Sequence, residues 1–495
     1  MTKKKNVLLI LSDQQRLDSL SVYHNAFGGA AGNVVRTPHI DALAREGMRF
    51  SNAYCSSAIC APSRASLMTG LFAHRHGVID NFTDIRPGTP LLSEEMKKAG
   101  YYCGYAGKWH VSPTRTPEDC GFHGKAFMGY AFPGSGVFPS LKFNQPPDNQ
   151  PNYYDEYLKE KGFEGIDVSH GFMGANPALQ IQEMYARHDG PVESTIEYFV
   201  AEEAIHEIDL ANESGKPFFI WANFWGPHSP SIVPEPYFSM YDPNDIPEHP
   251  SYRETFADKP YGYYLTEKMW GNGPYGWKGF ADISAKYFGH CTFIDDMVGR
   301  ITDRLKQLGI YNDTVIIYAA DHGDCLGAHK LIEKGCFAFQ EIYRIPLIVK
   351  PAHETPPAPA ERVNDSMVYL QELMPTILDI AGTAPPKPVD GNSLLPLISD
   401  DASDNGRREI FGEFHDHFYH TRQRLVTTKD YWFTFNESER GELYDLNADH
   451  YQLVNRCYDP AYQVIKTDLM DRLSDWMKKT GDPDSTWYHR IKEYY

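Results

Sequence analysis

Short runs of consecutive apolar residues alternate along the chain with longer stretches in which apolar residues recur at helical spacing. Runs of the first kind cover residues 6–11, 217–223, 314–318 and 345–349. Continuous apolar character over so few residues predicts strands that are buried on both faces of a sheet. Stretches of the second kind include residues 37–47, 194–212 and 283–308. The alternation predicts an α/β protein with a mainly parallel central sheet flanked by helices.

Capping residues mark the ends of two predicted helices. Thr37 precedes a proline at the start of the first, and Gly47 follows its last apolar position, so Thr37 is the predicted N-cap and Gly47 the stop. The second helix is predicted over 62–68, where a proline stands at the start and Gly70 ends the pattern.

The composition changes towards the C-terminus. Residues 383–406 are rich in proline, aspartate, serine and glycine, which is typical of a boundary between domains. Apolar and polar residues then alternate over 409–414, 424–428 and 431–435. This alternation predicts a short antiparallel sheet, and a helix is predicted to follow over 461–478. We therefore expect a catalytic α/β domain over 1–390 and a smaller α+β domain over 391–495.

Two further segments, 121–165 and 232–280, are rich in glycine, proline and aromatic residues and show little periodicity. This composition predicts long loops, and such loops in a compact domain usually serve function. Their aromatic side chains could line the part of a pocket that receives a substrate's leaving group, or could pack against a second subunit in a homo-oligomer.

Net charge and the length of the apolar runs limit the kinds of partner that the chain is expected to bind. Of its 495 residues, 42% are hydrophobic, and 47 basic against 66 acidic residues give a net charge of −19. An acidic chain is an unfavourable partner for nucleic acid, so none is expected. The longest early apolar run, 7–11, is far below the roughly 20 residues of a membrane span and too short for a secretory leader. We therefore expect no membrane partner and a cytoplasmic location.

Polar side chains follow two of the predicted buried strands. Asp13 and Gln14 come directly after the first strand, and Asp321 and His322 follow the strand over 314–318. Ligands of open parallel sheets lie at the carboxyl ends of the strands, so these pairs are expected to meet. Two carboxylates, an amide oxygen and an imidazole suit a divalent cation. Either aspartate alone would be better explained as a polar strand end or a helix cap.

Basic side chains follow other strands in the same way. Lys108 and His110 come after a strand-like segment over 101–106, His228 follows the strand over 217–223, and Lys334 comes after the Asp321 pair. Each alone is better explained as a surface lysine or a structural histidine. Together they would offer positive donors around one pocket, as an anionic ester substrate requires.

Cys60 raises a separate question. The chain has eight cysteines and no C-x-x-C pair, which favours reduced thiols over a disulfide framework. Near Arg64 and at a predicted helix N-terminus, the thiolate of Cys60 would be favoured and could act as a nucleophile. No histidine close in sequence supplies a base. From the residues alone, a buried thiol, a metal ligand and a nucleophile all stay open.

The segment from Cys60 to Gly70, CAPSRASLMTG, resembles the signature of the type I sulfatases, C-x-P-x-R followed by T-G. These enzymes belong to the alkaline phosphatase superfamily, so the resemblance implies an alkaline-phosphatase-like sheet with a small C-terminal domain. It also implies that a maturation enzyme oxidises Cys60 to formylglycine. One hydroxyl of the hydrated aldehyde then attacks sulfur, and the second later expels sulfate.

The resemblance also implies a role for each candidate residue. Four would hold a divalent metal, usually calcium: Asp13, Gln14, Asp321 and His322. Six would serve catalysis: Cys60, Arg64, Lys108, His110, His228 and Lys334. Of these, Arg64 and Lys108 would hold the formylglycine hydroxyls and the sulfate, and His110 would take a proton from the second hydroxyl. His228 and Lys334 would contact sulfate oxygens, with His228 protonating the leaving oxygen. Asn81 resembles a substrate-pocket asparagine of choline-sulfatase-like members.

Two ligand positions depart from the common pattern. Many sulfatases have aspartate where this chain has Gln14, and asparagine is common in place of His322. The set therefore carries two negative charges and one nitrogen donor, which weakens the case for calcium over manganese. The same pairs also look like those of phosphonate monoester hydrolases, which use the same formylglycine. The motif from Lys108 to His110 is more typical of sulfatases.

Three functions follow as hypotheses. The first is a sulfatase that hydrolyses aryl or carbohydrate sulfate monoesters and needs a formylglycine-generating enzyme as a partner. The second is a phosphonate monoester or phosphodiester hydrolase with the same machinery. The third is a non-catalytic, metal-stabilised binding protein in which Cys60 remains a thiol, and it would make the clustered cations coincidental.

Overall fold

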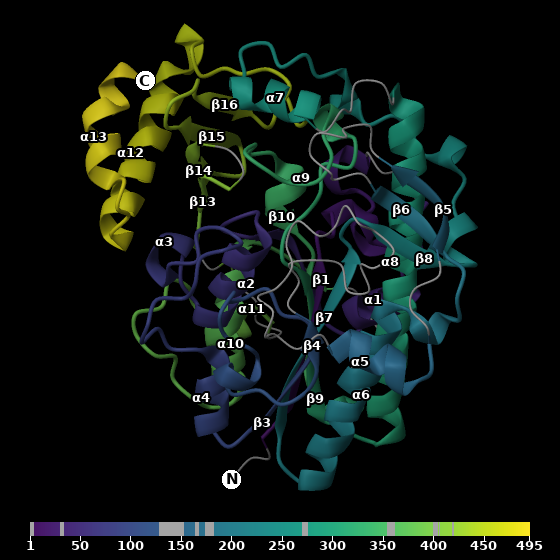
Figure 1. Ribbon diagram of the computed structural model, residues 1–495. Coiled ribbons are helices and arrows are strands. Elements are labelled where there is room, and N and C mark those ends of the chain that lie inside the picture. Colours follow the sequence, from purple (N-terminus) through teal and green to yellow (C-terminus); the bar gives the residue numbers. More distant parts are fainter. Residues whose placement is uncertain are drawn as a thin grey trace.

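The computed structural model describes residues 4–29, 34–127, 153–163, 168–173, 183–269, 276–353, 362–398, 404, 406–417 and 420–495. In this part of the chain a large central sheet has the order β10-β2-β11-β9-β1-β7-β3-β4, with β12 beside β2 (Figure 1). Its strands are β1 (Asn6–Asp13), β2 (Met48–Tyr54), β3 (Tyr102–Lys108), β4 (Ala126–Phe127), β7 (Phe218–Pro227), β9 (Thr314–Ala320), β10 (Arg344–Ile345), β11 (Leu347–Lys350) and β12 (Arg362–Tyr369).

The centre of the sheet is parallel. β1 pairs in parallel with β7 on one side and β9 on the other, and β3 and β4 continue the parallel order beyond β7. The carboxyl ends of these strands therefore meet at one edge. β11 is the strand predicted over 345–349, and it runs antiparallel to β9. A local apolar pattern does not indicate the direction of a strand within its sheet. The existence of this strand was therefore predictable, but its antiparallel direction was not.

Alternate side chains of β1 enter two hydrophobic cores, one on each face of the sheet. Val7, Leu9 and Leu11 lie in one core and Leu8 and Ile10 in the other, all fully buried. The helices of the first core include α2 (Cys60–Thr69), α4 (Leu92–Lys98) and α10 (Leu373–Ile380). Those of the second include α1 (Pro38–Arg45), α6 (Ile196–Ser214) and α8 (Gly276–Gln307). The predicted buried strands flanked by helices are thus confirmed.

The predicted ends of two helices are partly wrong. Thr37 is the N-cap residue of α1, as predicted, but its side chain makes no capping hydrogen bond, and the helix ends at Arg45 before the predicted stop at Gly47. The carboxylate of Asp295 on α8 instead accepts hydrogen bonds from the amides of His39 and Ile40, at 3.0 and 2.7 Å. Helix α2 begins at Cys60, two residues before the predicted start, and ends as predicted at Gly70, whose φ is 70°.

A second, antiparallel sheet lies towards the C-terminus, and two helices pack beside it (Figure 1). Its strands are β13 (Ile410–His415), β14 (Arg422–Thr427), β15 (Tyr431–Asn436) and β16 (Glu442–Asp445). The helices are α12 (Gln463–Thr480), which was predicted, and α13 (Ser485–Ile491). Residues of this sheet and of α12 share the first hydrophobic core with the central sheet. The domain boundary near residue 390 stays a prediction.

The remaining elements include a small sheet of β5 (Val168–Met173), β6 (Glu183–His188) and β8 (Ser231–Pro234). The remaining α-helices of the described residues are short: α3 (Ala73–His76), α5 (Tyr153–Glu160), α7 (Tyr261–Met269), α9 (Gln340–Tyr343) and α11 (Leu395–Ile398). The prediction of one long loop over 232–280 is wrong, because α7 and the start of α8 lie there. Most of the other predicted loop, 128–152, lies outside the described residues.

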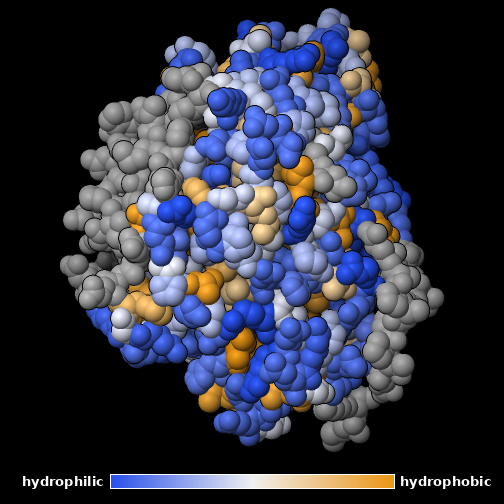
Figure 2. Space-filling model, turned by 90° about the vertical axis from the view of Figure 1, so that its right-hand side faces the viewer, coloured by the Kyte–Doolittle hydropathy of each residue, from blue (hydrophilic) through white to orange (hydrophobic). Residues whose placement is uncertain are grey.

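The described surface gives little sign of a large apolar face. On the side shown in Figure 2, hydrophobic residues are scattered as small separate spots over a mostly hydrophilic surface. Among the helices that the structure describes, none is both long enough and apolar enough to span a bilayer.

Candidate active site

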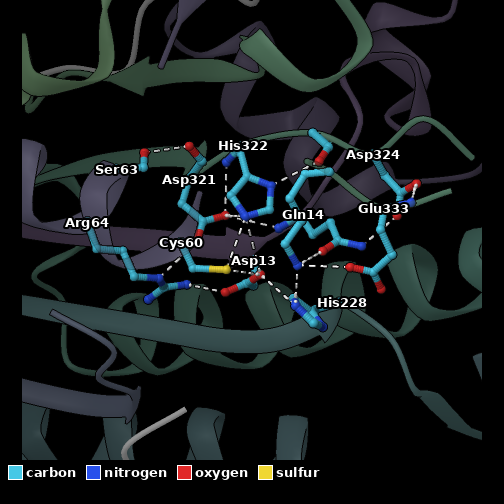
Figure 3. A network of polar contacts seen from close by, with 12 residues as sticks. Asp13, Gln14, Cys60, Ser63, Arg64, His228, Asp321, His322, Asp324 and Glu333 are labelled. Atoms are coloured by element: carbon cyan, nitrogen blue, oxygen red, sulfur yellow. Dashed lines mark hydrogen bonds and ion pairs between the residues drawn. The ribbon is translucent and has the colours of Figure 1, made fainter. Parts of the chain in front are cut away.

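The polar residues predicted at the strand ends come together with Cys60 (Figure 3). Asp13 ends β1, and Asp321 and His322 follow β9. The Cys60 sulfur lies 3.2 Å from Nε2 of His322 and 3.7 Å from Oδ1 of Asp13. Cys60 and the other three side chains are all buried. The structure thus brings two segments from distant parts of the sequence to one point, as their places after parallel strands predicted.

Cys60 is the first residue of α2 and therefore lies at the positive end of the helix dipole. This end of a helix favours negative charge. Ser63 fixes the helix to the β9 end by donating its hydroxyl to the carbonyl oxygen of Asp321 at 2.6 Å. The amide of Ala61 donates to Oδ1 of Asn81 at 3.1 Å, which places the predicted pocket asparagine one residue from Cys60.

Arg64 lies one turn further along α2 and joins the two carboxylates. Its Nε donates to Asp321 at 2.8 Å, and its Nη2 donates to Asp13 at 3.0 Å. Nη1 donates to the side-chain oxygen of Asn223 at 3.0 Å and to the Lys108 carbonyl at 3.2 Å. Burial opposes the guanidinium charge, but the two carboxylates outweigh it and raise the Arg64 pKa. In this arrangement Arg64 orients the aspartates that flank Cys60.

Lys108 and His110 approach the same carboxylate from β3. The Lys108 ammonium lies 2.6 Å from Oδ2 of Asp13 and 4.5 Å from the centre of the Trp225 ring. His110 is buried beside it, with a φ of 44°. Burial and the charge of Lys108 hold the His110 pKa well below its usual range, so the imidazole is neutral and can accept a proton. Burial would raise the pKa of Asp13, but its cationic neighbours, Lys108 first, lower it.

Lys334 and His228 form a second basic pair near the Asp13 carboxylate. The Lys334 ammonium lies 2.6 Å from Nε2 of His228 and 2.9 Å from Oε2 of Glu333, and it also donates to Oε1 of Gln14. Burial opposes its charge, but Glu333 outweighs burial and raises the Lys334 pKa. The Lys334 ammonium can only donate hydrogen bonds, so Nε2 of His228 accepts one from it. The proton of the neutral His228 ring therefore lies on Nδ1. Nδ1 donates to the Ser229 carbonyl at 2.6 Å.

Two acidic residues that the sequence did not single out hold this pair in place. Asp324 accepts from the side-chain amide of Gln14 at 2.6 Å, while its other oxygen accepts from the backbone amide of Glu333 at 2.9 Å. Burial opposes ionisation of Glu333, but Lys334 and His228 overcome it and lower the Glu333 pKa to about 2. Both residues stand beside predicted ones in the sequence. That adjacency was the only signal available for them.

The geometry fits a divalent cation at the predicted place. Ligand atoms of Asp13, Asp321, His322 and Cys60 all lie within 4.8 Å of one another. Nδ1 of His322 lies 2.9 Å from the Gly323 carbonyl, which only accepts, so Nδ1 carries the proton. The lone pair of Nε2 therefore faces Oδ1 of Asp13 at 4.0 Å and of Asp321 at 3.9 Å. Three electron-rich atoms that face one another suit a cation between them. The amide oxygen of Gln14, the fourth predicted ligand, accepts instead from Lys334.

Comparison with known proteins bears on the whole of this architecture. The sulfatase family profile matches residues 5–383, and a profile for the C-terminal part of N-sulphoglucosamine sulphohydrolase matches residues 327–479. An arylsulfatase of Clostridium perfringens is 30% identical over 93% of this chain and 92% of its own length. A multifunctional alkaline phosphatase superfamily protein, PehA, of Trinickia caryophylli is 28% identical over 98% and 97% of the two chains.

The fold is shared with solved structures as well. A phosphonate monoester hydrolase of Agrobacterium radiobacter superposes with a TM-score of 0.76 at 23% identity and covers 96% of both chains. This likeness confirms the predicted fold class, a mainly parallel sheet with a smaller antiparallel sheet after it. The family profile covers most of the chain, and the clostridial relative covers nearly all of it. The chain therefore belongs to the sulfatase family and is a sulfuric ester hydrolase.

Proposed function

We propose that this protein hydrolyses aryl or carbohydrate sulfate monoesters with a formylglycine made from Cys60. The observation that carries the proposal is the position of Cys60 at a helix N-terminus, where its sulfur lies 3.7 Å from Oδ1 of Asp13. Lys108 and Nε2 of His228 lie 2.6 and 4.0 Å from the Asp13 carboxylate, and Lys334 lies 2.6 Å from Nε2 of His228. A sulfate monoester is a compact anion, and buried cations with fixed positions are the groups that stabilise charge as its ester bond breaks.

Two groups complete this site. Hydrated formylglycine supplies two hydroxyls where the Cys60 sulfur now lies, one to attack sulfur and one to expel sulfate from the enzyme afterwards. A divalent cation, calcium or manganese, would supply positive charge beside that nucleophile. Asp13, Asp321 and His322 would hold it, and Gln14 would join them if its amide oxygen turned away from Lys334.

The basic side chains divide the remaining work by position. Lys108 and Lys334 balance the charge of the sulfate oxygens. His110 is neutral and buried, so it can take the proton of the second hydroxyl as sulfate leaves. His228 keeps one proton on Nδ1 through Ser229, so a proton gained at Nε2 can be given to the leaving oxygen. Arg64 keeps Asp13 and Asp321 in place.

A phosphonate monoester or phosphodiester hydrolase is the second candidate. It is favoured by Gln14 and His322, which replace the aspartate and asparagine common in sulfatases. Both reactions displace an oxygen from a tetrahedral centre and need the same cations. Both kinds of substrate are tetrahedral monoanions, and the second organic group on phosphorus takes the place of one sulfate oxygen, so rates must decide between them.

The test is a rate comparison with matured enzyme. The chain is produced together with a formylglycine-generating enzyme, and mass spectrometry of the Cys60 peptide measures the matured fraction. Values of kcat/KM are then compared for 4-nitrophenyl sulfate and a 4-nitrophenyl phosphonate monoester. We expect the sulfate to be the better substrate and Cys60→Ala to abolish turnover without loss of folding. A Cys60 peptide that stays a thiol, or a fully active Cys60→Ala variant, would remove formylglycine from the mechanism.

A further inference from the structure

The C-terminal sheet docks directly against the segment that leads into the nucleophile. The amide of Glu413 on β13 donates to the carbonyl oxygen of Ser56 at 2.8 Å, and its carboxylate lies 2.9 Å from Nδ1 of His74. Next along β13, Phe414 is buried in one cluster with Ile59 and Cys336. Ile59 precedes Cys60, and Cys336 lies two residues after Lys334. The end of β13 is therefore fixed beside the active site.

His417 follows this strand end and connects to the residue next to Cys60. The backbone amide of Ala61 fixes the oxygen of the Asn81 side chain, so the nitrogen of that side chain is the donor. It lies 3.4 Å from Nε2 of His417, which is buried. Burial, followed by the charges of Lys334 and His322, lowers the His417 pKa to about 3. His417 is thus a neutral group within electrostatic reach of the basic residues around Cys60.

Phe82 covers this pair from the solvent side. It follows Asn81 in the chain and is 48% exposed, whereas Asn81 is partly buried and His417 is buried. The Phe82 and His417 rings are stacked, with centroids 6.0 Å apart and 28° between their planes. The Phe82 amide donates to Oδ1 of Asp80 at 2.8 Å, which holds the turn that presents the ring. An exposed aromatic face therefore stands next to two neutral polar groups, one of which contacts the residue after Cys60.

We infer that Asn81, Phe82 and His417 form the subsite for the leaving group, and that this group is an uncharged ring with a flat face, aryl or sugar. The inference rests on the proposed function, because it assumes that the ester is cleaved at Cys60. Phe82 stacks on the ring, and His417 positions the Asn81 amide for a polar contact with it. The Asp80 carboxylate, which holds the turn of Phe82, would repel an anionic leaving group. The C-terminal sheet thereby supplies a specificity residue.

The first experiment measures leaving-group selectivity in matured enzyme. The sulfate esters are 4-nitrophenyl sulfate, N-acetylglucosamine 6-sulfate, hexyl sulfate and a trimethylammonium alkyl sulfate. Phe82→Ala removes the aromatic contact with the ring. For at least one ring ester, its kcat/KM divided by that of hexyl sulfate should therefore fall about tenfold. Phe82→Tyr keeps an aromatic ring and should restore this ratio. Whether the aryl or the sugar ester responds identifies the ring. Trp487→Ala, which removes a comparably exposed ring on α13, is the matched control.

A second experiment tests His417 as a positioning residue. In His417→Ala the KM for the ring ester should rise about threefold to tenfold, while the inhibition constant of inorganic sulfate stays the same. His417→Gln keeps an acceptor for Asn81 and should recover most of the loss. Thermal melting separates these effects from unfolding. An equal change in both constants, with no recovery in His417→Gln, would overturn the positioning role.

Other outcomes separate the subsite from the reaction. An unchanged ring-to-hexyl ratio in Phe82→Ala would overturn the subsite while leaving the sulfatase proposal intact. A selective loss with the trimethylammonium ester would overturn the assignment to an uncharged ring. If the wild-type enzyme cleaves none of the sulfate esters, the proposed function fails. Phosphonate esters with the same leaving groups would then test the subsite.

Discussion

Asp13 is the residue on which the charges of the site converge. Its carboxylate lies within 3.0 Å of both Arg64 and Lys108, and Nε2 of His228 is 4.0 Å away. Burial works against its charge, but the surrounding cations lower its pKa. These cations are buried in turn, so each depends on the carboxylate for its own stability. One side chain thus serves the fold and the chemistry together.

Asp13→Asn is therefore expected to lower both stability and activity. The amide keeps the shape but leaves Lys108 without its counter-charge and Arg64 with only that of Asp321, which should cost about 3 kcal/mol in the free energy of unfolding. Urea denaturation of the purified variant measures this loss, and a sulfate ester assay measures the rate. Equal midpoints for the variant and the wild type would show that the cations are compensated elsewhere.

The two lysines of the site should each matter for rate. Removal of one oxyanion donor typically lowers the rate by roughly two to three powers of ten, so Lys108→Ala and Lys334→Ala are both expected to fall in this range. Values of kcat/KM for 4-nitrophenyl sulfate at equal formylglycine content give the comparison. Lys98→Ala is the control, because that lysine is 69% exposed on α4. Full activity in either site variant would exclude that lysine from charge stabilisation.

At the scale of elements, the local sequence pattern predicted which strands and helices exist but not which of them contact one another. The strands at 6–11 and 314–318 were predictable because apolar residues fill both faces, and their polar ends then located the site. The hydrogen bonds that cap α1 were not predictable, because Asp295 lies on α8, which is far from α1 in the sequence. The start of α8 was hidden because glycine and aromatic residues interrupt the helical period there.

The same limit explains which site residues were missed. Asn223 ends a predicted strand and binds Arg64, and a polar side chain at that position was its only signal. His417 had none, since its place beside Asn81 depends on how two sheets dock. Gln14 was predicted as a metal ligand, and its bond to Lys334 depends on the path of the loop after β9.

The carboxyl end of β7 offers a test of how an element positions a catalytic side chain. A Cβ added to Gly226 would lie 2.2 Å from Nε2 of His290, which is itself held 2.8 Å from Glu197. Because this pair is buried, Gly226→Ala should displace the strand end that carries His228. We expect a loss of about 1–3 kcal/mol in stability and a lower kcat.

Thermal melting and the sulfate ester assay measure the two effects of Gly226→Ala. Gly262→Ala is the matched control, since its added Cβ would meet only the Cys336 sulfur, at an ordinary 3.4 Å. If Gly226→Ala behaved like this control, the packing of His290 against β7 would not be what positions His228.

In the whole molecule, the two sheets act as one folded unit around the site. Residues of the C-terminal sheet share a core with β1 and α2, and Arg424 of β14 pairs with Asp482 beyond α12 at 2.6 Å. The chain carries a net charge of −19, and the cations of its buried site are paired with carboxylates. Net charge therefore does not draw a sulfate ester to the protein, which makes the contacts within the site more important than long-range attraction.

Stability of the whole molecule should be greatest in mildly acidic solution, because buried carboxyl groups shift in opposite directions. Burial would raise the pKa of Glu254, but His329, 3.0 Å away, and Lys259 lower it to about 2. Its stabilisation is present above the unfolded value of about 4.3 and is lost as pH falls towards 2. Burial raises the pKa of Glu207, whose carboxylate accepts from the Tyr102 hydroxyl at 2.9 Å, to about 7. The folded state then keeps a proton that the unfolded chain has lost, so stability falls as pH rises from about 4.3 to 7.

Two substitutions should separate the loss of stability in acid, which Glu254 causes, from the loss of stability towards neutral pH, which Glu207 causes. In Glu207→Gln the fall in stability between about pH 5 and pH 8 should shrink by the Glu207 contribution, on the order of 3 kcal/mol, while the loss of stability in acid remains. In Glu254→Gln the stability near neutral pH should drop and the loss of stability in acid should shrink. Urea denaturation across this range measures both, with Glu160→Gln, at an exposed position of α5, as the control. A Glu207→Gln profile parallel to that of the wild type would mean that Glu207 ionises normally in the folded protein.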